Sequence, residues 1–177
     1  YSQRSSSPRS EDGHQTRNDM AISNLEKYRD DLNNLIREGG LVSISLYKMA
    51  YGNQYYEVVL LQHKGDEAKA KKEFDSVEPF EKVYQHWYSE ALPLVKQLLP
   101  DRLADFVRLY ERPKTRKEIS YASYRIEDAC QGLSITRGGT VTVSSKAAIN
   151  LLEQQIAIVE AIKRRFESSL FDIKQLV

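Results

Sequence analysis

The chain has 177 residues, of which 29% are charged, and a formal net charge of only +1. Because acids and bases nearly cancel, no global field draws the protein to nucleic acid or to an acidic membrane, so a basic site has to be local. A single cysteine, Cys130, excludes an internal disulfide framework and a zinc site built from cysteines. No apolar run is long enough to span a bilayer, and we expect a cytoplasmic protein.

The first helix is expected to follow a polar tail. Residues 1–19 contain almost no apolar side chains, which predicts a disordered tail in front of a single domain at residues 20–177. Residues 23–26, with the sequence SNLE, have the pattern of a capping box, in which two side chains satisfy free backbone N–H groups at a helix start. Apolar residues then recur at helical spacing as far as Gly39, which is predicted to end this helix.

Residues 41–62 fit two different structures. Val42, Ile44 and Leu46 alternate with polar residues as in a strand, and Gly52-Asn53 is suited to the turn of a hairpin. A lone two-stranded hairpin is marginally stable, and we find no third strand elsewhere in the chain. The helical interpretation is therefore preferred, with a short hairpin as the alternative.

Helices are also expected in the middle of the chain. Residues 66–74 are rich in Lys, Glu and Ala, which predicts a solvated helix, and residues 76–99 carry apolar side chains at helical spacing around Trp87, which predicts a core helix. Pro93 is predicted to kink or divide that helix, because it lacks a backbone donor. Pro100 suits the first turn of a further helix that continues to Tyr110.

The next predicted elements are a helix, a turn and an extended connection. Residues 115–118 form a second candidate capping box, and apolar residues continue at helical spacing until Gly132, which is expected to close the helix. Gly138-Gly139 predicts a turn, and Thr140 to Val143 predict a short extended connection. Ser144 or Ser145 then caps the terminal helix.

The terminal helix is expected to run from Ser144 to Val177. At about 1.5 Å per residue it would be roughly 50 Å long, more than a small bundle covers. Its apolar stripe therefore predicts contact with another copy of the chain, or with a C-terminal effector domain beyond Val177. The residues assigned to this partner interface are Ile156, Val159, Phe166, Leu170 and Ile173. Together these elements predict an all-α fold, an irregular helical bundle with a long C-terminal amphipathic helix.

No catalytic, metal or cofactor site is predicted. His14, His63 and His86 are far apart in the sequence, and two or three scattered histidines do not make a metal site. Cys130 lies on the apolar face of its predicted helix, which favours a packing role over a reactive thiol. The chain has no Gly-rich phosphate loop and no nucleophile elbow.

The strongest local signal is a basic connector. Positive charge interleaved with aromatic rings is typical of sites that hold a phosphate backbone while stacking bases, so the connector predicts RNA or other nucleic-acid binding. A solvated link between two helices is the simpler explanation and the preferred one. The residues assigned to nucleic-acid binding are Arg108, Arg112, Lys114, Arg116, Lys117, Tyr121 and Tyr124.

Several short strings resemble the N-terminal region of a family of uncharacterised bacterial proteins. The strings are LLPDRL at 98–103, DFV at 105–107, YRIED at 124–128 with Gly132-Leu133, and RFESSLFDI at 165–173. The resemblance covers residues 76–177 well and residues 32–75 loosely. In longer members this region leads into a C-terminal domain similar to HEPN domains, which are often dimeric and often act as metal-independent ribonucleases in toxin or defence systems.

That resemblance implies no activity within this chain. HEPN ribonucleases use an Arg and a His about five residues apart on one helix, and the pair with this spacing here, Arg9 and His14, lies in the polar tail. A catalytic element would lie beyond Val177. The leading hypothesis is thus a non-catalytic oligomerisation or regulatory module of a bacterial protein, and the alternative is a nucleic-acid-binding module that uses residues 108–117.

Overall fold

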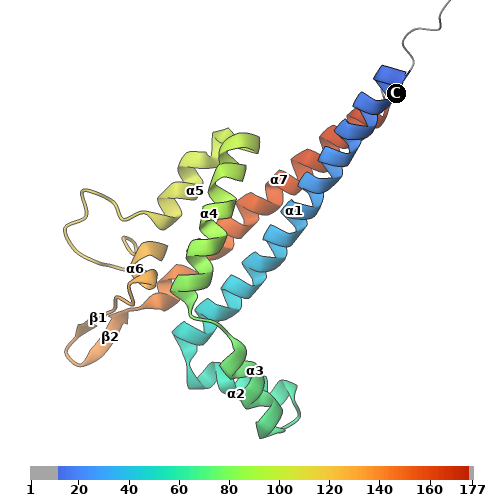
Figure 1. The fold of residues 1–177 in the computed structure, drawn as a ribbon. Coiled ribbons are helices and arrows are strands. Elements are labelled where there is room, and N and C mark those ends of the chain that lie inside the picture. Colours follow the sequence, from blue (N-terminus) through green and yellow to red (C-terminus); the bar gives the residue numbers. More distant parts are fainter. Residues whose placement is uncertain (1–11, 176–177) are drawn as a thin grey trace, which may run out of the picture.

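The computed structural model describes residues 12–175, and the fold is essentially all-α, as predicted (Figure 1). The helices are α1 (Asp12–Tyr51), α2 (Asn53–Gln62), α3 (Glu67–Ser76), α4 (Phe80–Leu98), α5 (Leu103–Tyr110), α6 (Ile126–Cys130) and α7 (Ile149–Gln175). Short 3₁₀ turns at Pro100–Arg102 and Ser145–Ala148 lead into α5 and α7. A small hairpin pairs β1 (Ile135–Arg137) with β2 (Thr140–Val143).

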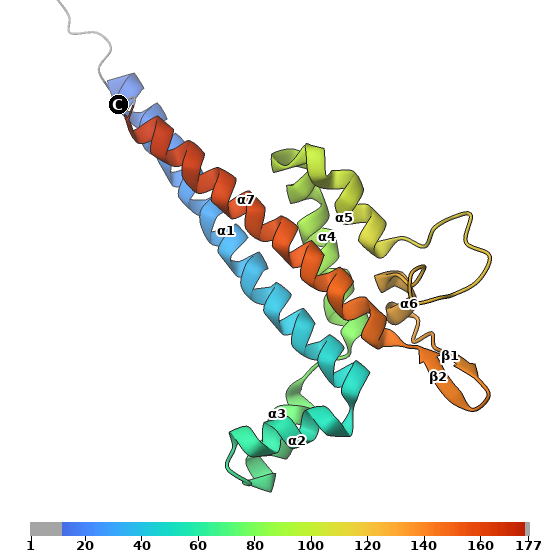
Figure 2. The same cartoon turned by 180° about the vertical axis from the view of Figure 1, so that it is seen from behind.

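The two longest helices, α1 and α7, lie side by side and run in opposite directions (Figure 1). Helix α4 packs against both of them, and α5 covers α7 and α4 (Figure 2). Helices α2 and α3 form a separate arm at one end of α1, and the opposite ends of α1 and α7 extend beyond α4 and α5. The predicted long C-terminal helix is therefore present, and it packs mainly on the first helix.

The core forms around α4, because its apolar residues recur every three or four positions and so occupy one face. Tyr84 and Trp87 are fully enclosed together with Phe106 of α5. Their polar atoms are satisfied, since Trp87 Nε1 donates to the carbonyl oxygen of Leu35 at 2.9 Å and the Tyr84 hydroxyl donates to Gln155 Oε1 at 2.9 Å. These bonds tie α4 to α1 and to α7 in the same buried layer.

Helix α1 does not end at Gly39, contrary to the prediction. It continues through Gly39-Gly40 to Tyr51, because Gly39 serves packing and not helix termination. A Cβ atom at Gly39 would lie 3.3 Å from Ile156 Cγ1 and 3.3 Å from Trp87 Nε1. Glycine therefore lets α1, α4 and α7 approach closely at this level, whereas Gly40 faces open space.

The start of α1 is also earlier than predicted. Residues 12–19 are helical, so the expected disordered tail is wrong for these residues, and residues 1–11 lie outside the described part of the chain. The SNLE string at 23–26 lies inside the helix and is not its first turn. The polar sequence is helical here because α7 runs alongside, a neighbour that local sequence does not show (Figure 2).

Residues 41–62 are helical, which confirms the preferred interpretation and rules out the hairpin. Val42 is buried, and so are Ser45 and Leu46, which follow it by three and four residues and therefore lie on the same helix face. Gly52 has a φ of +50° and forms the corner between α1 and α2, a conformation that suits glycine. The alternation of Val42, Ile44 and Leu46 thus reflects two sides of a helix, since Ile44 is exposed.

The proline predictions and the terminal cap have mixed outcomes. Helix α4 is not divided at Pro93 and continues from Phe80 to Leu98. Pro100 lies in the first turn before α5, as predicted. The Ser144 hydroxyl accepts a hydrogen bond from the backbone N–H of Lys146 at the start of the turn that leads into α7, as the predicted cap requires.

The region between α5 and α7 differs most from expectation. Only residues 126–130 of the helix predicted between residue 115 and Gly132 are helical, and residues 111–125 are irregular. Gly132 closes α6 with a φ of +67°, as predicted. The turn at Gly138-Gly139 is confirmed, but the extended connection that follows it is a strand, with Thr136 opposite Val141.

Candidate functional site

The basic connector was the predicted nucleic-acid site, and most of its arginines are paired with acids. Arg108 Nη2 lies 3.1 Å from Asp105 Oδ1, and Arg112 Nε lies 3.3 Å from Glu127 Oε2. The Arg112 backbone N–H also donates to Glu127 at 2.9 Å. These carboxylates compete with a phosphate for the same guanidinium groups, which weakens the electrostatic case for nucleic-acid binding.

Arg116 has a structural role. Its Nη1 and Nη2 atoms donate to the two Asp128 carboxylate oxygens at 2.6 and 2.9 Å, and Nη1 also donates to the Ser123 carbonyl oxygen at 3.0 Å. The side chains of Arg116 and Asp128 are 10% and 0% exposed. The hydrogen bonds that Arg116 donates to Asp128 raise the pKa of Arg116. The prediction that Arg116 contacts nucleic acid is therefore wrong, because its donors are already used inside the protein.

Tyr124 is equally unavailable for base stacking. Its ring is fully buried, its hydroxyl donates to the Leu133 carbonyl oxygen at 2.8 Å, and burial raises its pKa. Its assignment to the nucleic-acid site is wrong for this reason. Tyr121 is 64% exposed, and Lys114 and Lys117 are exposed as well. The nucleic-acid prediction thus depends on these three side chains.

The hollow beside the basic connector is lined by both acidic and basic side chains. It has a volume of about 590 Å³ and is lined by Glu111 and Glu127 as well as by Arg112, Lys114 and Arg116. Across residues 105–128 the sequence has six basic and five acidic residues. This surface therefore does not present the excess of positive charge that typically binds a phosphate backbone.

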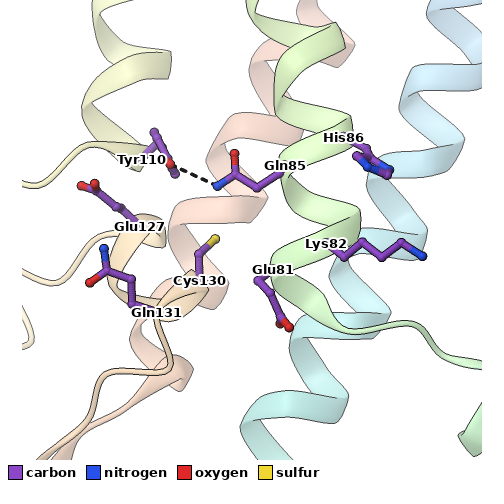
Figure 3. Close-up of a pocket in the computed structure, with 8 residues that line it drawn as sticks. All are labelled: Glu81, Lys82, Gln85, His86, Tyr110, Glu127, Cys130 and Gln131. Atoms are coloured by element: carbon purple, nitrogen blue, oxygen red, sulfur yellow. Dashed lines mark hydrogen bonds between the residues drawn. The ribbon is translucent and has the colours of Figure 1, made fainter.

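A second hollow, of about 390 Å³, lies between α4 and α6 around Cys130 (Figure 3). Gln85 Nε2 donates to the Tyr110 hydroxyl at 3.1 Å, and the Cys130 thiol points toward the same space. Burial raises the pKa of Cys130 to about 12, although a hydrogen bond with Gln85 acts in the opposite direction. The thiol is therefore neutral at physiological pH and is a poor nucleophile.

The remaining polar side chains at this hollow do not converge on one point. Lys82 and His86 extend from the other side of α4, away from Cys130 (Figure 3). Among the described residues, no group of three or more His, Cys, Asp or Glu side chains is close enough to hold a metal ion. This hollow thus presents separate polar groups and no assembled set of acid, base and nucleophile.

The predicted partner face of α7 is divided by the fold. Val159 is fully buried, so it belongs to the core and not to a partner interface as predicted. Ile156 is half-buried and packs beside Gly39, so its assignment to a partner interface stays a prediction. Helices α1 and α4 pack against this part of α7, and the local sequence pattern does not show that they do. Phe166 is half-buried. The side chains of Leu170 and Ile173 lie outside the described set.

The outer parts of α1 and α7 form a two-helix stalk, which we define as residues 12–31 with residues 163–175 (Figure 2). Tyr28 lies four residues before buried Leu32 and seven before buried Leu35, so it continues the core-facing stripe. Yet Tyr28 is 48% exposed, and Met20, eight residues earlier, is 62% exposed. The stripe continues where α4 and α5 no longer cover it.

Phe166 belongs to the same level of the stalk. Gly39 and Ile156 face each other across the antiparallel pair. Ten residues along α7 from Ile156 is Phe166, and ten residues back along α1 from Gly39 is Arg29, next to Tyr28. Since both helices rise about 1.5 Å per residue, Phe166 lies close to the level of Tyr28.

An apolar groove between α1 and α2 was not predicted. Its α1 wall consists of Ile44, Tyr47 and Tyr51, its α2 wall of Gln54, Tyr55 and Val58, and its volume is about 360 Å³. The spacing of Ile44, Tyr47 and Tyr51 signals an apolar helix face, but only once residues 41–62 are known to be helical. Because the pattern of residues 41–62 also fits a strand, this groove was not predicted from the sequence.

Comparisons with known proteins found no match among protein families, curated proteins or solved structures. The resemblance to bacterial proteins that continue into HEPN-like domains therefore stays a prediction. Within residues 12–175, no helix is both long and apolar enough to cross a membrane.

Proposed function

We propose that this chain is a non-catalytic helical module that self-associates through its stalk. The observation that carries the proposal is the exposure of Tyr28 on a stripe whose next members, Leu32 and Leu35, are buried. Two antiparallel helices with an uncovered apolar flank correspond to half of a four-helix bundle. Two stalks packed together would cover Tyr28, Met20 and the region of Phe166 in both copies.

The interface is proposed to be isologous, because identical stalks related by a two-fold axis present the same residues to each other. Aromatic side chains and methionine are enriched in the cores of such interfaces. The charged residues on the remaining faces of the stalk, including Arg29 and Asp30, stay in solvent. Self-association at this position leaves the α2–α3 arm of each copy outside the interface, because the arm lies at the end of α1 opposite to the stalk.

Sedimentation equilibrium of the full chain across micromolar concentrations tests the proposal. We expect a dimer, and Tyr28→Glu should weaken it at least about tenfold, because a charge in the apolar contact costs more than about 1.4 kcal/mol. Tyr121→Glu is the matched control, since Tyr121 is an exposed tyrosine outside the stalk. A strictly monomeric wild-type protein, or equal effects of both substitutions, contradicts the proposal.

A further inference from the structure

The apolar groove between α1 and α2 is a second uncovered surface, remote from the stalk. We propose that it binds one amphipathic helix of a partner protein, and that this helix carries acidic residues beside its apolar face. The groove is lined by α1 and α2, and the chain turns from one helix into the other at Gly52. Figure 2 shows the corner between these two helices. Val58 is 50% exposed there, and Leu61, one turn further along α2, is 78% exposed.

The groove walls are held in place without a ligand. The rings of Tyr47 and Tyr51 stack with centroids 5.8 Å apart, and Tyr55 packs on Phe74 of α3 at 6.0 Å. Lys48 Nζ donates to the carbonyl oxygens of Phe74 at 2.7 Å and Val77 at 3.3 Å, which ties the end of α3 to α1. A preformed groove binds more tightly, because fewer groups are ordered on association.

The chain's own described ends do not supply the occupant. The start of α1 and the end of α7 lie together, at the other end of α1 from the groove (Figure 1). From Asp12 to Ile44 the helix is about 48 Å long at 1.5 Å per residue.

The size of the patch favours a single helix over a second copy of the chain. Its exposed apolar side chains, Ile44, Tyr47 and Val58, form a small patch of the kind that is often functional on monomers. A stable dimer interface takes about 800 Å² and about 20–30 residues from each partner, whereas six residues line this groove. A helix laid in a groove uses fewer contacts, with apolar anchors at positions i, i+3 or i+4, and i+7.

The length of the α1 wall matches such a helix. Ile44, Tyr47 and Tyr51 have spacings of three and four residues and cover two helical turns, about 10 Å. Three anchors of a partner helix cover the same distance. Val58 on the opposite wall gives the anchors an apolar contact on their second side.

The charge of the partner helix follows from the cations at the two ends of the α1 wall. Arg37 lies seven residues before Ile44 and so occupies the same line on α1, and its side chain is exposed. At the other end, Lys146 Nζ lies 4.8 Å from the centroid of the Tyr51 ring. Acidic residues that flank the partner's apolar face would meet both cations.

Fluorescence anisotropy with two labelled, stapled helical peptides tests the proposal. The peptides, each of about 14 residues, share one leucine ridge at i, i+3 and i+7, and carry either Glu or Lys beside it. We expect the acidic peptide to bind saturably to the full chain, at least about tenfold more tightly than the basic one. Val58→Asp should weaken that binding at least about tenfold, because it places a charge in the apolar groove.

Tyr121→Asp is the matched control, because it adds the same charge at an exposed site outside the groove. Circular dichroism checks that both variants keep their helical content, as expected for exposed positions. Equal affinity for the two peptides, no saturable binding, or retained affinity in Val58→Asp overturns the proposal. Binding to phosphatidylserine vesicles, in place of the acidic peptide and lost in Val58→Asp, would assign the groove to a lipid surface and also overturn it.

Discussion

The guanidinium of Arg116 and the carboxylate of Asp128 form a two-pronged ion pair inside the protein, with N–O distances of 2.6 and 2.9 Å. Asp128 Oδ2 also accepts the backbone N–H of Arg125 at 2.8 Å, at the start of α6. The pair therefore joins the irregular connector to the helix that follows it. The pair also explains how the basic connector between α5 and α6 is held in place, because its Arg116 is bound to Asp128.

Arg116→Ala should lower the free energy of unfolding by about 3–5 kcal/mol, because it leaves the Asp128 carboxylate buried without its counter-ion. The free energy of unfolding of Arg116→Lys should lie between those of the wild type and Arg116→Ala, since an ammonium group keeps the charge but does not reproduce the bidentate geometry. Urea denaturation followed by circular dichroism measures both effects. Lys117→Ala, at an exposed neighbouring position, should change stability by less than about 0.5 kcal/mol. Equal losses for Arg116→Ala and Lys117→Ala would disprove the structural role of the pair.

The two adjacent glycines of α1 should respond oppositely to substitution. Gly40→Ala should stabilise the protein by about 0.5–1 kcal/mol, because alanine favours helix and the site is open. Gly39→Ala should be less stable than Gly40→Ala by about 1–2 kcal/mol, because its Cβ meets Ile156 and Trp87 and overpacks the core. The hydrogen bond from Trp87 to the Leu35 carbonyl oxygen, at 2.9 Å, resists movement of the indole ring away from the added methyl group. Thermal denaturation compares the two variants, and identical melting temperatures would refute this packing.

Lys48 should control how firmly the α2–α3 arm is attached. Its ammonium group donates to two carbonyl oxygens and lies 4.4 Å from the centroid of the Phe74 ring. Lys48→Met keeps the apolar stem but removes the donors, so backbone amides of residues 67–76 should exchange at least about tenfold faster with deuterium, given about 1.5–3 kcal/mol for a hydrogen bond to a charged group. Lys72→Met, on the exposed face of α3, is the control. Unchanged exchange in Lys48→Met would show that the arm is held by other contacts.

Cys130 should react slowly in the folded protein. With its pKa raised to about 12, about one thiol in ten thousand is ionised at pH 8. Alkylation by iodoacetamide should therefore be at least about a hundredfold slower in the folded chain than in urea, where the pKa returns to about 8.5. Mass spectrometry measures both rates. Comparable rates would mean that the thiol is not shielded.

The same pKa shift makes stability depend on pH. Because the folded pKa of the Cys130 thiol is raised, its contribution to stability is complete below its ordinary pKa and is lost as pH rises toward 12. Tyr88, whose pKa burial also raises to about 12, acts in the same direction above pH 10. Urea denaturation at pH 8 and pH 10.5 should show lower stability at the higher pH, and Cys130→Ser should reduce that difference.

Much of the fold follows from local pattern. The apolar spacing around Trp87 predicted α4, Pro100 predicted the turn before α5, and Ser144 predicted the cap before the terminal helix. Each depends on interactions within a few residues, such as one face of a helix or one backbone N–H at its start. Such interactions are the same in the isolated segment and in the folded chain, so the sequence alone indicates them.

The candidate sites were harder to predict because their chemistry depends on distant neighbours. Arg116 and Tyr124 look like nucleic-acid contacts in the sequence, but Asp128 and the Leu133 carbonyl oxygen occupy their polar groups. The apolar groove was overlooked because its α1 wall was hidden in a segment that also fits a strand. Exposure decides what a charged or aromatic side chain binds, and exposure is a property of the assembled core.

The sequence by itself therefore determined the class of fold, the main helices and the amphipathic character of the last one, since these depend on composition and period. Only the tertiary structure decided that Gly39 joins three helices, that Val159 lies in the core, and that Tyr28 remains exposed on the stalk. The physical reason is that burial results from the packing of elements far apart in the chain. The spacing of apolar residues shows which side chains lie on one face of a helix, and the neighbouring helices determine which of them are buried.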